Sequence, residues 1–294
     1  MKIRNWYSKI LILDFLEYNK TFNSLRFSSL YIILIFVINL IIAGCEKSEN
    51  IQFTDSPIIT SYLHPESYFF VNIAHQVPFV SNVEYADDDI NNLSIIVSSN
   101  DTIYMLKPAG DGNYIDSSLI VTEGDVYDLS FAFNQKEVSA YTYIPSKPVD
   151  VTQSTTQISI ERMDSTFIPS PGSMPDPIEI IWNNDDQSYY LLVIENTETE
   201  LDPIRDFGDD DAPERLFRNA PTNSSSVEIR ANDFQYYGYH RVILYHVLPD
   251  YASLYESTNN SSLNLTNPST SIKNGYGIFT GLNSDTLFIN VKEG

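Results

Sequence analysis

The chain is poor in cysteine and in basic residues, and both shortages exclude kinds of protein. Its 294 residues include one cysteine, Cys45, so no intramolecular disulfide can form and the fold depends on its packed core. Only 17 residues are Lys or Arg, against 39 that are Asp or Glu. The formal net charge of −22 repels nucleic acid and anionic lipid headgroups, so we expect neither as a partner.

Sequence signatures of catalysis are also scarce. The chain contains no G-x-S-x-G elbow, no P-loop and no dinucleotide-binding fingerprint. A hydrolase that uses two carboxylates stays open, but the many acidic residues offer so many pairs that none stands out. The four histidines form no H-E-x-x-H pair, so we expect no catalytic residue and no enzyme; they are His64, His75, His240 and His246.

The most informative feature that is present is the apolar run before Cys45. Residues 30–43 carry no charge, and the run closes with Ile41-Ile42-Ala43-Gly44. These 14 residues are short for a membrane-spanning helix, which needs about 20, but they suit a signal peptide. The preceding segment has the expected positive bias, with five basic residues against two acidic ones. Small residues followed by cysteine resemble the lipobox of bacterial lipoproteins.

Cleavage at this motif would remove a signal peptide of residues 1–44 and leave Cys45 as a lipidated N-terminus carrying palmitate or similar acyl chains. More than one acyl chain anchors a protein stably to a membrane that it does not span. The mature chain would keep 12 basic and 37 acidic residues, a net charge of −25. Residues 45–55 are polar and suit a lipidated tether. The alternative is an uncleaved N-terminal anchor helix with an incidental cysteine.

From residue 56 onward, apolar residues recur with a period of two, which predicts strands and an all-β fold. Asn134-Gln135 is expected to form a tight turn between two of them, because Asn tolerates positive φ. Short strands at this spacing predict an immunoglobulin-like β-sandwich over residues 56–147. The expected strands are 58–63, 67–77, 93–98, 102–106, 113–115, 126–133 and 137–144.

A second β region follows the segment Ile144-Pro145-Ser146-Lys147-Pro148. Two prolines three residues apart stop ladder pairing and make a stiff link, so we expect a domain boundary there. Trp182, followed by alternating apolar residues at 190, 192 and 194, indicates a fibronectin type III-like sandwich over residues 148–294. A short helix is expected at 249–257, with a proline in its first turn. The expected strands are 157–161, 178–182, 189–195, 226–230, 241–247, 276–279 and 286–291.

A long acidic loop is expected in the second domain, because nine acidic residues fall between Glu195 and Glu214. Carboxylate-rich clusters suit Ca²⁺, which makes Asp209, Asp210 and Asp211 candidate metal ligands. The D-x-D-x-D-G spacing of a calcium loop is missing, however, so a solvated loop without a cofactor is the favoured interpretation. Asp87-Asp88-Asp89 is a similar case.

Three tyrosines lie close together just before an expected strand: Tyr236, Tyr237 and Tyr239. Tyrosine rings pair an apolar face with a polar tip, so a cluster of them can bind a sugar or a protein partner. The alternative is that members of the cluster pack into the sandwich.

Several segments spread over nearly all of the mature chain carry a resemblance to a known family: 144–148, 180–182, 189–193, 267–268, 272–279 and 283–286. In these segments the chain resembles a family of outer-membrane lipoproteins of unknown function that is abundant in Bacteroidota. The resemblance implies an outer-membrane location, on the periplasmic or cell-surface face, and an association with a TonB-dependent transporter. It supplies no catalytic residues.

These observations favour a lipid-anchored envelope protein that binds a ligand or partner as an accessory of an outer-membrane uptake system. A carboxylate-dependent hydrolase of envelope or environmental polymers is one alternative. A structural or adhesive surface protein is the other.

Overall fold

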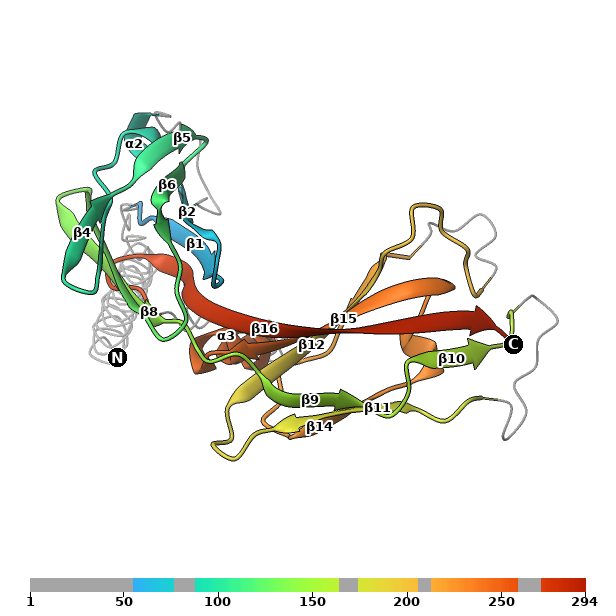
Figure 1. Cartoon of the computed structure of the whole chain (residues 1–294). Helices are drawn as coiled ribbons and strands as arrows, with labels where there is room; N and C mark the ends of the chain where they lie inside the picture. Colours follow the sequence, from blue (N-terminus) through green and yellow to red (C-terminus); the bar gives the residue numbers. More distant parts are fainter. Residues whose placement is uncertain (1–54, 77–87, 164–173, 206–212, 259–270) are drawn as a thin grey trace, which may run out of the picture. The chain divides into compact units, whose positions relative to one another are not determined.

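The computed structural model describes residues 55–76, 88–163, 174–205, 213–258 and 271–294, all within the unit Thr54–Gly294. The fold of this part is all-β, as the period of two predicts (Figure 1). Its helices are short: α2 (Asp88–Asn91), α3 (Pro249–Thr258) and the 3₁₀ turn η1 (Ala231–Asp233). Among the described residues, no helix is long and apolar enough to cross a membrane.

Two sheets share the first hydrophobic core. One has the strand order β4-β3-β7-β8, and β5, β6, β2 and β1 belong to the other. Alternate side chains of β1, β2 and β7 enter the core, and in β7 the inward residues from Tyr127 to Phe133 are all buried. The bounds are β1 (Ile58–Leu63), β2 (Tyr68–Ala74), β3 (Ile96–Ser99), β4 (Thr102–Met105), β5 (Lys107–Gly110), β6 (Asn113–Ile120), β7 (Val126–Phe133) and β8 (Lys136–Tyr143).

The second core lies between a three-stranded sheet, β14-β11-β9, and the sheet segment β13-β12-β15-β16. Trp182 packs here against Tyr190, with ring centroids 5.3 Å apart, as the alternating pattern predicts. The bounds are β9 (Val149–Gln153), β10 (Gln157–Ile160), β11 (Ile178–Asn183), β12 (Tyr189–Asn196), β13 (Leu216–Arg218), β14 (Ser226–Ile229), β15 (Gly238–Val247) and β16 (Tyr276–Glu293).

The last strand, β16, corrects the sequence-based expectation of two strands with a break between them (Figure 1). It is continuous for 18 residues, because the polar residues in its middle form hydrogen bonds with neighbouring segments of the chain instead of forming a turn. The Nδ2 group of Asn283, for example, donates to Glu123 Oε2 at 2.9 Å and to the Pro145 oxygen at 3.0 Å. β16 pairs with β1 in parallel, with β15 in antiparallel and with β10 in parallel orientation.

The two cores are joined through β16. Its residue Phe279 packs in the first core, whereas Ile289 and Val291 pack in the second. Ile272, just before the strand, also belongs to the first core. The division into domains at 147/148 stays a prediction, but any such division must share this strand.

Several local expectations are confirmed. Asn134 and Gln135 both have positive φ, 47° and 62°, at the tight turn between β7 and β8. The helix expected at 249–257 is α3. Asp55 differs from its expectation as part of the tether, because it is attached to the β fold: its carboxylate lies 2.5 Å from His75 Nδ1, and its main-chain oxygen accepts a hydrogen bond from Asn134 Nδ2.

Candidate functional site

An open groove of about 440 Å³ lies between β13 and β14, the edge strands of the two sheets around the second core. Two edge strands that do not pair with each other leave the interior of a sandwich accessible from the side. The floor contains the buried residues Leu192 and Ile229, and the partly buried Phe217 and Val227 stand beside them. The volume of the groove is in the range of small-ligand sites.

The rim of the groove is polar and charged, with Asn219, Glu228, Arg230 and Asp233. Asp233 is held in place because its Oδ2 accepts a hydrogen bond from the Arg230 main-chain N–H at 2.8 Å. The Arg230 guanidinium is 71% exposed and contacts Glu228 only at 3.4 Å. This long, exposed ion pair is weak, so the guanidinium can turn towards an anionic group in the groove.

A separate, much smaller hollow of about 10 Å³ lies beside the groove, and Phe217 and Asp233 line both. A space of that size holds about one water molecule. Ile194, Tyr236 and His240 also line it. The small hollow therefore borders the tyrosine segment that the sequence singles out. The three tyrosine rings, however, do not all face this hollow.

His240 is buried and neutral. Its Nδ1 lies 3.1 Å from the Gly238 oxygen, which makes Nδ1 the donor, and its Nε2 accepts from Asn196 Nδ2 at 3.3 Å. Burial lowers the pKa of His240, and the hydrogen bond to Gly238 opposes this only in part. Both ring nitrogens are occupied by structural hydrogen bonds, so the imidazole positions β15 against β12.

The three candidate tyrosines do not form one exposed surface. Tyr236 and Tyr237 are 2% and 5% exposed, and only Tyr239, at 57%, faces solvent. The Tyr236 hydroxyl donates to the Pro213 oxygen at 2.6 Å, and that of Tyr237 donates to the Ile160 oxygen at 3.0 Å. Both buried rings thus act in the core, and Tyr236 fixes the chain where the acidic segment ends.

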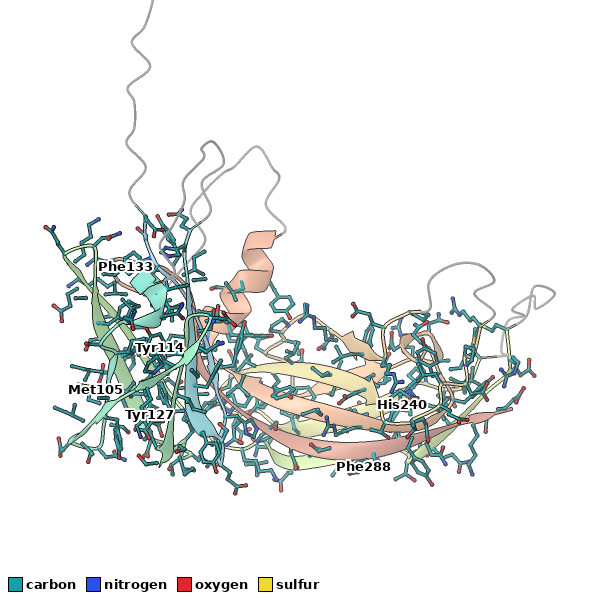
Figure 2. The ribbon with its side chains drawn as sticks, turned by 90° about the horizontal axis from the view of Figure 1, so that it is seen from above. Met105, Tyr114, Tyr127, Phe133, His240 and Phe288 are labelled. Carbon is teal, nitrogen blue, oxygen red and sulfur yellow. The ribbon has the colours of Figure 1, made fainter. Side chains whose placement is uncertain are left out.

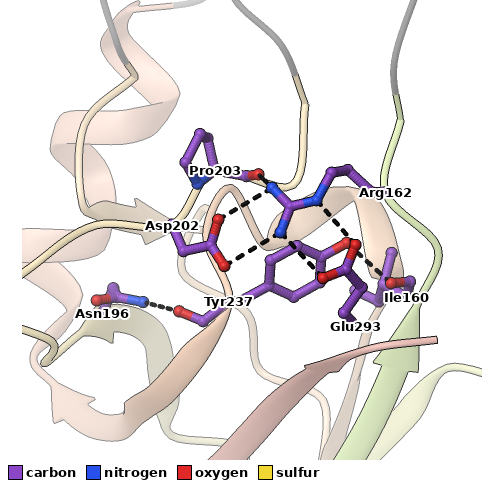
Figure 3. Close-up of polar contacts among 7 residues, drawn as sticks. All are labelled: Ile160, Arg162, Asn196, Asp202, Pro203, Tyr237 and Glu293. Atoms are coloured by element: carbon purple, nitrogen blue, oxygen red, sulfur yellow. Dashed lines mark hydrogen bonds and ion pairs between the residues drawn. The ribbon is translucent and has the colours of Figure 1, made fainter.

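The middle of the acidic segment, at Asp202 and Pro203, is fixed by Arg162 (Figure 3). Its guanidinium forms bidentate ion pairs with Asp202 and Glu293, at 2.8–3.1 Å, and also donates to the Pro203 oxygen at 2.9 Å. It also lies 4.9 Å from the centroid of the Tyr237 ring. These bonds use all five N–H groups of the guanidinium, so Arg162 joins Glu293, at the end of β16, to the acidic segment and has no donor left for a ligand.

The hydroxyl of Ser284 lies next to an imidazole, that of His64. The serine hydroxyl lies 3.0 Å from His64 Nε2, and His64 Nδ1 lies 2.9 Å from the Pro65 oxygen. A catalytic serine–histidine pair needs a third group that orients the imidazole, and here a main-chain oxygen of the next residue fills that place. The contact joins the end of β1 to β16.

Several candidates from the sequence lie outside the described residues: Cys45, Asp87, and Asp209, Asp210 and Asp211. The side chains of Asp88 and Asp89 are also not described. In the part of the chain that the structure describes, no group of three or more His, Cys, Asp or Glu side chains could hold a metal ion. The calcium site therefore stays a hypothesis.

Sequence reasoning missed the groove because β13 was not expected as a strand. Its three residues, Leu216-Phe217-Arg218, are too few to show alternation. The available signal was the pair of apolar residues at 216–217, just beyond the acidic segment.

Comparison with known proteins adds no relatives: no protein-family model matches the chain, and no curated protein matches it.

Proposed function

We propose that the protein is a lipid-anchored outer-membrane protein that binds a ligand or partner through the groove between β13 and β14. Cys45 carries the lipid, and the β region extends from it as two sandwich domains of immunoglobulin-like and fibronectin type III-like type. The partner belongs to an outer-membrane uptake system, and a TonB-dependent transporter is the component that the family resemblance suggests.

The observation that carries the binding role is the groove itself. Its apolar floor favours an apolar group, since burying such surface contributes about 25 cal/mol per Å². The exposed guanidinium of Arg230 adds an anion-binding group at the rim. The combination fits an apolar group with a carboxylate or similar anionic end, either in a small ligand or in the side chains of a protein partner.

Filling the groove tests this role. Val227→Trp places a large ring where the groove opens, while Ile181→Trp places the same ring on the exposed face of the neighbouring strand β11, where Ile181 is 45% exposed. Both variants are purified with their membrane partners from detergent-solubilised outer membrane. We expect Val227→Trp to lose the partner and Ile181→Trp to keep it, with melting temperatures close to that of the wild type. Equal recovery of the partner by the two folded variants would exclude the groove as the binding site.

A further inference from the structure

β4 is the outermost strand of the sheet β4-β3-β7-β8, so within the described residues its second edge has no partner strand. Natural edge strands are commonly protected by charged residues, proline or bulges. The sequence Thr102-Ile103-Tyr104-Met105 contains none of these, and its pairing with β3 is regular. Ile103 is 74% and Met105 64% exposed, more than any other large hydrophobic residue described. Figure 2 shows Met105 at the outer margin of the ribbon.

The register of β4 determines which backbone groups are free. Leu106 N–H donates to the Ile95 oxygen at 3.0 Å, and Tyr104 pairs with Val97 two residues further along. Hydrogen-bonded and non-hydrogen-bonded pairs alternate in an antiparallel ladder. Tyr104 therefore directs its N–H and C=O towards β3. Ile103 and Met105 direct theirs outward, where they can bind another strand.

This edge is complementary to itself. If two β4 strands pair in antiparallel orientation about a two-fold axis at Tyr104, Ile103 of one copy comes opposite Met105 of the other. Both residues direct their free groups outward, so the pairs form four interchain backbone hydrogen bonds. The same axis brings the N-terminal end of each β4 close to the C-terminal end of the other, so Asp101, in the β3–β4 turn, comes near Lys107, the first residue of β5 in the other copy, at both ends. Both residues are exposed, and they have opposite charges.

The side chains agree with this register. Ile96 pairs directly with Met105 on the outer face of the sheet. In the dimer, Met105 also lies opposite Ile103 of the second copy. Ile96, Met105 and that Ile103 therefore form a row of three apolar side chains across the joined sheet. The two-fold axis generates a second, equivalent row. Cross-strand apolar pairs of this kind stabilise sheets by about 0.2–1 kcal/mol each.

We propose that β4 is a self-association edge, at which two copies of this chain join their four-stranded sheets into one continuous antiparallel sheet. The occupant of the edge is a second copy because the backbone polarity and the apolar rows match in a single register, and because opposite charges, Asp101 and Lys107, stand just beyond the two ends of the edge. The contact is remote in sequence from the groove between β13 and β14 and does not depend on the proposed function.

Disulfide trapping tests the register directly. The full-length chain is prepared in detergent with Cys45→Ser, and two variants add Ile103→Cys or Met105→Cys. Directly paired residues have Cα atoms about 5.5 Å apart, a distance that a disulfide can bridge, so we expect the mixture to yield about tenfold more cross-linked dimer than either variant alone. A mixture of Ile103→Cys with Tyr141→Cys, an exposed residue of the same sheet face on β8, is the control.

The charge pairs supply a second readout. Lys107→Glu places like charges near each other at both ends of the paired strands, so this dimer should be weaker than the wild type at 0.1 M salt and should strengthen at 1 M, where the Debye length falls to about 3 Å. The wild-type dimer should weaken over the same range. A chain that sedimentation equilibrium shows to be monomeric throughout would overturn the proposal. So would a mixture of Ile103→Cys and Met105→Cys that cross-links no better than the control mixture.

Discussion

The imidazole Nδ1 of His246 lies 2.8 Å from the main-chain oxygen of Ser146. The ring also stacks on Tyr190, with centroids 4.8 Å apart. Because Asn283 donates to the Pro145 oxygen beside it, the proline-rich segment 145–148 is fastened to β15 and β16 at successive residues. A segment with the composition of a linker is thus a fixed part of the fold.

Proteolysis measures this attachment. We expect the wild type to resist cleavage at 145–148 by a broad-specificity protease, whereas the double variant His246→Ala, Asn283→Ala should be cut there on the order of thirtyfold faster. The two lost hydrogen bonds contribute about 1 kcal/mol each to keeping the segment closed. Asn274→Ala, which removes an exposed side-chain hydrogen bond to the Glu137 oxygen, is the control and should be cleaved at the same rate as the wild type. Rapid cleavage of the wild type would show that the segment is free.

Close backbone contact between β1 and β16 predicts a second effect. Gly277 has φ of +101°, and a Cβ there would overlap the Ile59 main-chain oxygen. Gly124 has φ of +80° with open space around it. Alanine at either position is strained, at about 1 kcal/mol, but Gly277→Ala must also displace β1, at a further cost of about 1–3 kcal/mol. Urea unfolding should therefore show a clearly larger loss for Gly277→Ala, and equal losses would contradict the contact.

The sequence predicts most of this fold where apolar residues alternate. The bounds of β1 and β7 match the expected segments, and the turn at Asn134 follows from its tolerance of positive φ. Strands held mainly by partners were missed: β5, β9 and β13 have few buried residues, so they show no alternation. The continuity of β16 was also missed, because its polar middle is satisfied by contacts with residues more than 130 positions away, such as Pro145. The groove was missed for a similar reason, because β13 and β14 are placed by their pairing with β12 and β11.

The burial of His240 gives stability a pH dependence. Because burial lowers its pKa in the folded state, the unfolded chain takes up a proton first as the pH falls through about 6.5, and protonation then favours unfolding. The contribution of neutral His240 is thus fully present above pH 6.5 and is lost below it. His240→Gln should flatten the slope of unfolding free energy between pH 7 and 5. An unchanged slope in the variant would show that His240 does not titrate in this way.

The lipid anchor is tested by metabolic labelling with an alkynyl fatty acid. The wild type should take up label and fractionate with the membrane, and Cys45→Ser should lose the label because the chain then has no thiol that could accept an acyl chain. A Cys45→Ser protein that is still labelled would refute the lipobox interpretation. Ser48→Ala, in the same polar segment, is a control that should label normally.

Photo-crosslinking in living cells tests the central claim, binding in the groove, most directly. A photoreactive benzoyl-phenylalanine is placed at Val227, in the groove, or at Ile181, on the opposite face of the same sheet. The account predicts a discrete adduct from position 227 that is absent from position 181 and that disappears when Arg230→Glu reverses the charge at the rim. No adduct at position 227, or the same adduct from both positions, would contradict it.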